Sequence, residues 1–85
     1  MKINMYGVSS CHDCVDAEKI LLEKKVKLNY LDFSTSALSL KTFLKLRDSL
    51  PLFEEVRQNG YIGIPLFQFE DGSMTLDLEE VLKRI

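Results

Sequence analysis

The chain has 85 residues, 46% of them hydrophobic and 28% charged, which is ordinary for one small globular domain, and we expect residues 1–85 to fold as a monomer. Its formal net charge of −2 is too small to predict a nucleic-acid partner or an anionic membrane partner. No stretch approaches the ~20 apolar residues of a membrane span, and the first residues lack the apolar core of a secretory signal, so we expect a soluble, cytoplasmic protein.

The first part of the chain predicts a strand followed by a helix. Residues 2–6 alternate between apolar and polar side chains, which predicts a strand that ends at Gly7. Ser10 can then cap a helix that runs to about Lys24, with Asp13 as a weaker version of the acid in a capping box. The residues expected to be buried share one face of this helix: Cys14, Ala17 and Leu21.

The middle of the chain predicts a second strand and two further helices. Residues 26–32 alternate again, and a strand, helix and strand of this length form a parallel pair with a right-handed crossover. Residues 34–36 offer N-caps for a helix over about Ala37 to Arg47. Pro51 suits the first turn of a short helix that Asn59-Gly60 ends.

The last part of the chain predicts a hairpin and a final helix. Residues 66–69 and 73–76 flank Asp71-Gly72, a pair that suits a tight turn in which both central residues take positive φ. Asp77 is predicted to cap a helix that contains Val81. The whole order predicts an α/β fold: a four-stranded mixed sheet of two parallel strands and a C-terminal antiparallel hairpin, with helices on both faces.

The two cysteines of the chain, Cys11 and Cys14, lie three positions apart where the first predicted strand meets the first predicted helix. The start of a helix favours negative charge and so stabilises the thiolate of the first cysteine. Because structural disulfides are unusual in the cytosol, the pair predicts thiol–disulfide exchange. Two alternatives stay open: a pair of ordinary buried cysteines, and a zinc or iron–sulfur site shared across a dimer or completed by outside thiols.

The two residues between the cysteines are candidates for tuning the pKa of the dithiol. A protonated His12 would favour the Cys11 thiolate, whereas Asp13 would oppose it through like charge and could also pair with His12. His12 has a plainer interpretation as an exposed polar residue. The sequence does not give the sign of the net effect.

The predicted order of elements, Cys11-His12-Asp13-Cys14 and Gly63-Ile64-Pro65 together resemble the thioredoxin superfamily and, in size, the glutaredoxins. The resemblance covers nearly the whole chain and implies a thioredoxin/glutaredoxin-like fold that reduces disulfides of proteins or small molecules. It implies that Cys11 is the nucleophile and Cys14 the resolving cysteine. It further implies that Pro65 is cis and that the backbone of Ile64 pairs with the substrate.

The resemblance implies no bound cofactor, and it makes glutathione or thioredoxin the expected electron donor. Asp77 and Arg57 could contact the two ends of glutathione, and Tyr6 could line the site, although a tyrosine at a strand end is more often part of the core. The family usually has proline and an aromatic residue where this chain has His12 and Asp13. That departure leaves a third alternative open, a non-catalytic binding module with the same fold.

Overall fold

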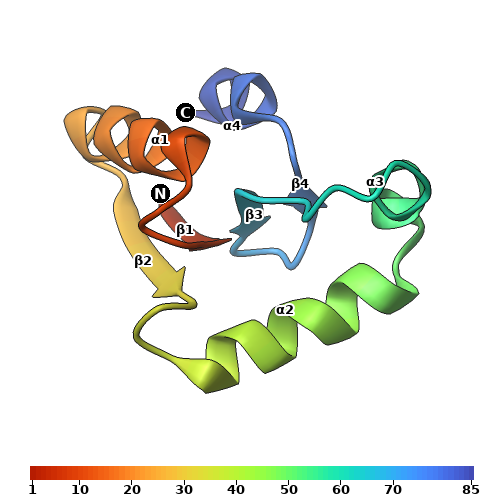
Figure 1. Cartoon of the computed structure of the whole chain (residues 1–85). Coiled ribbons are helices and arrows are strands. Elements are labelled where there is room, and N and C mark those ends of the chain that lie inside the picture. The colour runs from red at the N-terminus through yellow and green to blue at the C-terminus, as the bar shows by residue number, and fades with distance from the viewer.

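The computed structural model describes all 85 residues, which form a four-stranded mixed sheet with helices on both sides (Figure 1). The strands lie in the order β2-β1-β3-β4, with β2 parallel to β1, β3 antiparallel to β1, and β4 antiparallel to β3. Their bounds are Lys2–Gly7 for β1, Lys27–Asp32 for β2, Leu66–Phe69 for β3 and Met74–Thr75 for β4. The predicted α/β class is therefore confirmed, together with the parallel pair and the C-terminal hairpin.

The helices divide between the two faces of the sheet. Figure 1 shows α1 and α4 on one side and α2 on the other, with α3 beyond the end of α2. None of these helices is long and apolar enough to cross a membrane. Their bounds are His12–Glu23 for α1, Ala37–Ser49 for α2, Pro51–Phe53 for the 3₁₀ helix η1, Glu54–Gln58 for α3 and Leu78–Arg84 for α4.

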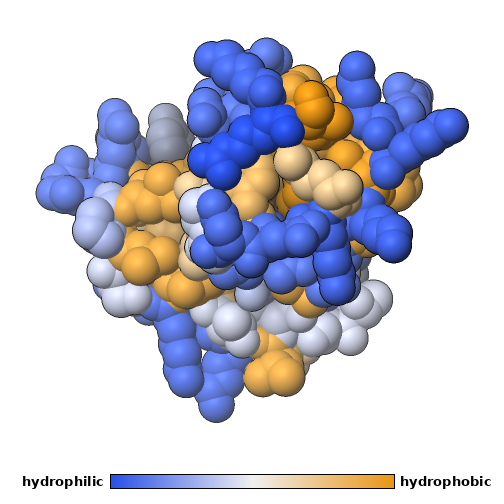
Figure 2. All heavy atoms as spheres, turned by 180° about the vertical axis from the view of Figure 1, so that it is seen from behind, coloured by the Kyte–Doolittle hydropathy of each residue, from blue (hydrophilic) through white to orange (hydrophobic).

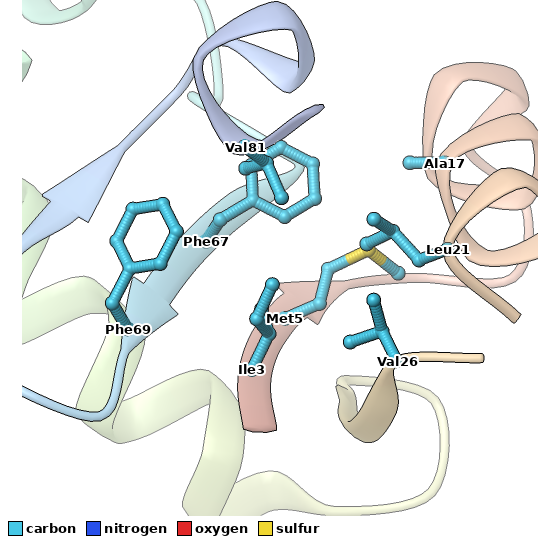
Figure 3. Close-up of a cluster of buried hydrophobic side chains, with 8 residues drawn as sticks. All are labelled: Ile3, Met5, Ala17, Leu21, Val26, Phe67, Phe69 and Val81. Atoms are coloured by element: carbon cyan, nitrogen blue, oxygen red, sulfur yellow. The ribbon is translucent and has the colours of Figure 1, made fainter. Parts of the chain in front are cut away.

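Each face of the sheet has its own apolar core. Side chains of β1 alternate between the faces, so that Ile3 and Met5 join the core beneath α1 and α4, whereas Tyr6 joins the core beneath α2. Figure 3 shows the first core, to which α1 contributes Ala17 and Leu21. The second core is smaller and consists of Tyr6, Phe43, Phe53 and Leu66. The first core therefore packs α1 on one face of the sheet, and the second packs α2 on the opposite face.

Two predicted helix ends need correction. The N-cap of α1 is Cys11 and not Ser10: the Cys11 Sγ accepts a hydrogen bond from the Cys14 N–H at 3.3 Å, after a turn in which the Cys11 N–H donates to the Val8 carbonyl. Helix α2 ends at Ser49 and not near Arg47. It stops there because a residue before proline is driven to extended backbone angles, and Leu50 precedes Pro51 with ψ of 138°.

The hairpin between β3 and β4 also differs from the predicted tight turn. Gly72 has a φ of +88°, but Asp71 keeps a negative φ, so the two-residue turn is wrong. The Phe69 carbonyl accepts from the Gly72 N–H, and the Phe69 N–H donates to the Ser73 carbonyl, as in a three-residue loop that ends in a left-handed glycine. The Asp71 carboxylate stabilises this loop by accepting from the N–H and hydroxyl of Ser73.

Candidate active site

Cys11 lies at the exact start of α1 in a half-buried position next to a surface pocket. The pocket is lined by Val8, Ser10, Cys11 and residues 60–64. The Cys11 sulfur therefore combines access from solvent with a hydrogen bond from the backbone of the first helical turn. The start of a helix presents backbone N–H groups without helical partners, and one of them, from Cys14, is directed at the Cys11 sulfur.

Cys14 lies one turn further along and is fully buried, on the face that also carries Ala17 and Leu21. Its burial was predicted from the helical spacing and is confirmed. Burial, reinforced by the hydrogen bond with the Cys11 side chain, raises the pKa of the Cys14 thiol to about 12, although the Val8 backbone acts in the opposite direction. Both cysteines are free thiols, so the pair presents one accessible sulfur and one sheltered sulfur.

Gly7 and Tyr30 enclose the Cys14 sulfur, and neither was among the predicted site residues. A Cβ atom on Gly7 would lie 2.7 Å from the Cys14 Sγ and 3.3 Å from the Tyr30 hydroxyl oxygen. This hydroxyl is buried and has no hydrogen-bond partner. The predicted parallel pairing could have indicated Tyr30, because it places Tyr30 opposite Met5 on the face that α1 covers.

The far wall of the pocket is the segment that leads into β3. Its Ile64–Pro65 bond is cis, in agreement with the expectation from the resemblance. Arg47 of α2 holds the segment in place, since its Nε donates to the Ile62 carbonyl at 2.9 Å and its Nη2 donates to the Tyr61 carbonyl at 2.6 Å. The pocket beside Cys11 therefore has a wall that is fixed to the opposite layer of helices.

Gly63 gives this wall its close packing. The residue has a φ of +92°, and a Cβ atom there would come within 2.9 Å of the Phe53 ring and 3.1 Å of Val56. Glycine avoids both the unfavourable backbone conformation and the overlap. The segment can therefore lie directly on η1 and α3 while Ile64 lines the pocket.

The side chains of His12 and Asp13 make no hydrogen bond or ion pair with either cysteine. The His12 side chain is 87% exposed and its Nε2 lies 3.1 Å from an oxygen of Asp16, one turn along the helix. The suggested pairing of His12 with Asp13 is therefore wrong. Asp13 is exposed and acts on Cys14 only as a minor like charge, which also raises the Cys14 pKa.

Three further residues suggested for substrate contact make structural contacts instead. Tyr6 is 6% exposed and packs near Phe43 in the core beneath α2. Arg57 donates to the carbonyls at the end of α2, including that of Leu50 at 3.0 Å. Asp77 caps α4 by accepting from the Glu79 N–H at 3.0 Å. None of the three lines the pocket around Cys11, which corrects the earlier expectation.

A larger pocket lies elsewhere, with a volume of about 570 Å³. Its lining includes Asn4, Asn29 and Gln68, which form a row of amide side chains across three strands and hydrogen-bond to one another. Seen from behind, the surface mixes hydrophilic side chains with several apolar areas (Figure 2). Pocket volume therefore does not single out the pocket beside Cys11, and the case for that pocket rests on the sulfur that borders it.

Few side chains near the two cysteines are placed to bind a metal ion. No group of three or more His, Cys, Asp or Glu side chains is placed to hold a metal ion. Because zinc usually takes four protein ligands in a structural site, a metal bound by Cys11 and Cys14 would need further ligands from another molecule.

A comparison with known proteins identifies a relative of this chain. A Haemophilus influenzae protein, described as an uncharacterized protein, is 31% identical over 77 residues, which cover 91% of this chain and 90% of that protein. No protein-family model matches the chain, and no solved structure matches it. The similarity extends over nearly the full length of both chains.

Proposed function

We propose that this chain, which belongs to the same family as the Haemophilus influenzae protein, is a thiol–disulfide oxidoreductase with a thioredoxin/glutaredoxin-like fold. The observation that carries the proposal is the difference between its two sulfurs. Cys11 is accessible at the start of α1 and accepts a backbone hydrogen bond, whereas Cys14 is fully buried behind it. A two-step exchange requires one accessible sulfur that attacks the substrate and one sheltered sulfur that resolves the mixed disulfide.

In the proposed cycle the Cys11 thiolate attacks one sulfur of a substrate disulfide. A bond forms between Cys11 and that sulfur, and the other substrate sulfur leaves as a thiolate and takes a proton from water. Cys14 then attacks the Cys11 sulfur, closes the Cys11–Cys14 disulfide and releases the second substrate thiol. Two electrons have passed to the substrate, and an outside thiol, such as glutathione or reduced thioredoxin, restores the dithiol.

The surroundings of Cys11 support a substrate that presents apolar groups beside its disulfide. The pocket wall includes Val8, Ile62 and Ile64, and a second apolar hollow that contains Leu40 and Leu44 of α2 continues from it. The cation in that hollow, Arg47, is already bound to backbone carbonyls. A disulfide in an extended peptide segment therefore fits better than a small charged disulfide, with the Ile64 backbone as the proposed contact to the segment.

The test is reduction of a protein disulfide, such as those of insulin, by the wild-type chain and two serine variants. Cys11→Ser should abolish the reduction, and Cys14→Ser should accumulate a mixed disulfide with the substrate that mass spectrometry detects. Cys11→Ser is also a sound control for folding, because serine is a better N-cap than cysteine and should keep the start of α1 intact.

Three outcomes would contradict the proposal. Full activity in Cys11→Ser would exclude Cys11 as the nucleophile. Stoichiometric zinc or iron in the purified protein would support the metal site instead. A folded wild-type chain that shows neither reductase activity nor metal would support the binding module.

A further inference from the structure

The Tyr30 hydroxyl is a buried polar group without a hydrogen-bond partner. Buried polar groups in folded proteins almost always have a partner, because an unpaired one has lost its hydrogen bonds to water without replacement. Phenylalanine at this position would fill the same space without that penalty. We therefore expect the hydroxyl to have a hydrogen-bond partner in a state of the protein other than the resting, reduced one.

The position of the Tyr30 hydroxyl relative to the Cys14 sulfur indicates its role. Tyr30 lies opposite Met5 in the β1–β2 pair and packs against the core beneath α1. Its oxygen borders the small space beside Gly7 that the Cys14 sulfur also borders, at 3.3 and 2.7 Å from the position of a Cβ on Gly7. Because Gly7 is a glycine, no side-chain carbon of β1 lies in that space.

We propose that the Tyr30 hydroxyl donates a hydrogen bond to the Cys14 sulfur when that sulfur becomes negatively charged in the resolving step. The inference rests on the proposed disulfide exchange and adds a residue to it. Tyr30 would stabilise the charge on a reacting atom that is fully buried in the reduced protein.

The charges around Cys14 show why a donor is needed. Burial disfavours a negative charge on Cys14, and so does the nearby Asp13 carboxylate. Glu18 of α1 and Asp32 of β2 act in the same direction on Tyr30. No cation is among the groups that act on either residue. Besides the Val8 backbone, the hydroxyl is thus the nearby group that can favour the Cys14 thiolate.

Tyr30 can act only as a donor in this role. Burial, followed by the charges of Cys14 and Asp32, raises the pKa of Tyr30 to about 12. It therefore keeps its proton near neutral pH and is not the base that removes the proton of Cys14. In the balanced step the Cys14 thiol loses its proton to water, the Cys14–Cys11 bond forms, the Cys11–substrate bond breaks, and the departing substrate sulfur takes up a proton.

The test uses the reduced full chain and the chromogenic disulfide 5,5′-dithiobis(2-nitrobenzoate). Attack by Cys11 releases a first coloured thiolate, and resolution by Cys14 releases a second, so one stopped-flow trace reports both steps. In Tyr30→Phe the first release should keep its rate and the second should become about tenfold slower or more, because a hydrogen bond to a charged group is lost. Tyr6→Phe, which removes the hydroxyl of a buried tyrosine in the other core, should change neither.

Two further measurements separate this role from a structural one. The rate of the second release should rise with pH in both chains, and at each pH between about 7 and 9 it should be lower in Tyr30→Phe than in the wild-type chain. The melting temperature should not fall, because the hydroxyl has no partner to lose. An unchanged second release, or a Tyr30→Phe chain that melts earlier or fails to fold, would overturn the inference and leave the disulfide exchange standing. A wild-type chain without a second release would overturn both.

Discussion

At the scale of single residues, Gly7 is the residue on which the position of Cys14 depends most directly. In Gly7→Ala the new Cβ would meet the Cys14 Sγ at 2.7 Å and the Cys14 Cβ at 3.2 Å. Gly7 lies in β1 without a positive φ, so alanine introduces overlap and no backbone strain. We expect unfolding in urea to show a loss of about 1–3 kcal/mol, as for other overpacked cores, and Cys14 to become open to alkylation.

The hairpin provides the matched control. Gly72 has open space around its Cα but a φ of +88°, and asparagine tolerates that conformation better than other residues with a side chain. Gly72→Asn should therefore cost clearly less stability than Gly7→Ala and leave Cys14 protected. Equal stability of Gly7→Ala and the wild-type chain would mean that α1 can move away from β1 at no cost.

The position of a residue could be predicted from the sequence when its contacts are with residues close to it in the chain. Helical spacing placed Cys14 on the buried face without knowledge of the fold. The pairing of His12 with Asp16 is also local, since residues four apart on a helix are neighbours. The roles of Gly7 and Tyr30 depend on how β2 lies against β1 and α1, and no local pattern carries that information.

At the scale of elements, Arg47 connects α2 to the wall of the Cys11 pocket. Its side chain is 22% exposed and donates two hydrogen bonds to the carbonyls of Tyr61 and Ile62. In Arg47→Met these carbonyls lose charged donors, which should cost about 1 kcal/mol of stability, since both bonds are exposed and water can replace the donor. The wall should also become mobile, so we expect kcat/KM for a protein disulfide to fall while alkylation of Cys11 by a small reagent keeps its rate.

Lys45→Met on the same helix is the control, because Lys45 is exposed and its side chain makes no hydrogen bond or ion pair. It should leave both stability and kcat/KM close to their wild-type values. If Arg47→Met behaved like Lys45→Met, the wall would not depend on α2 for its position.

The elements themselves were more predictable than their ends. Alternation and helical spacing identified all four strands and the main helices, because burial on one face imposes a period on the sequence. The cap of α1 shifted from Ser10 to Cys11 because the turn before it is closed by a backbone hydrogen bond to Val8. Arg57 was suggested for substrate contact, but its long side chain reaches the end of α2 instead. Which groups such a long side chain contacts depends on the packed structure and not on the position of the residue in the sequence.

At the scale of the whole molecule, the buried thiol and phenol predict a loss of stability at alkaline pH. Burial raises the pKa of Cys14 from 9.0 to about 12 and that of Tyr30 from 10.0 to about 12. Between these values the unfolded chain has released protons that the folded chain still holds, so the free energy of unfolding falls as pH rises. For the reduced protein we expect this fall to begin near pH 9 and to continue to about pH 12.

Oxidation provides the control within the same chain, because a Cys11–Cys14 disulfide has no thiol to titrate. The oxidised protein should keep its stability to about pH 10, where unfolded tyrosine begins to ionise, and the slope of its free energy of unfolding against pH should be shallower than that of the reduced protein. Cys14→Ala should reproduce the shallow slope without a disulfide, which separates the effect of titration from that of the cross-link. The measurement is the free energy of unfolding from urea titrations between pH 8 and pH 11. If its slope against pH were the same for all three proteins, Cys14 would ionise in the folded chain as readily as in the unfolded one. Its burial would then not protect the second sulfur of the pair.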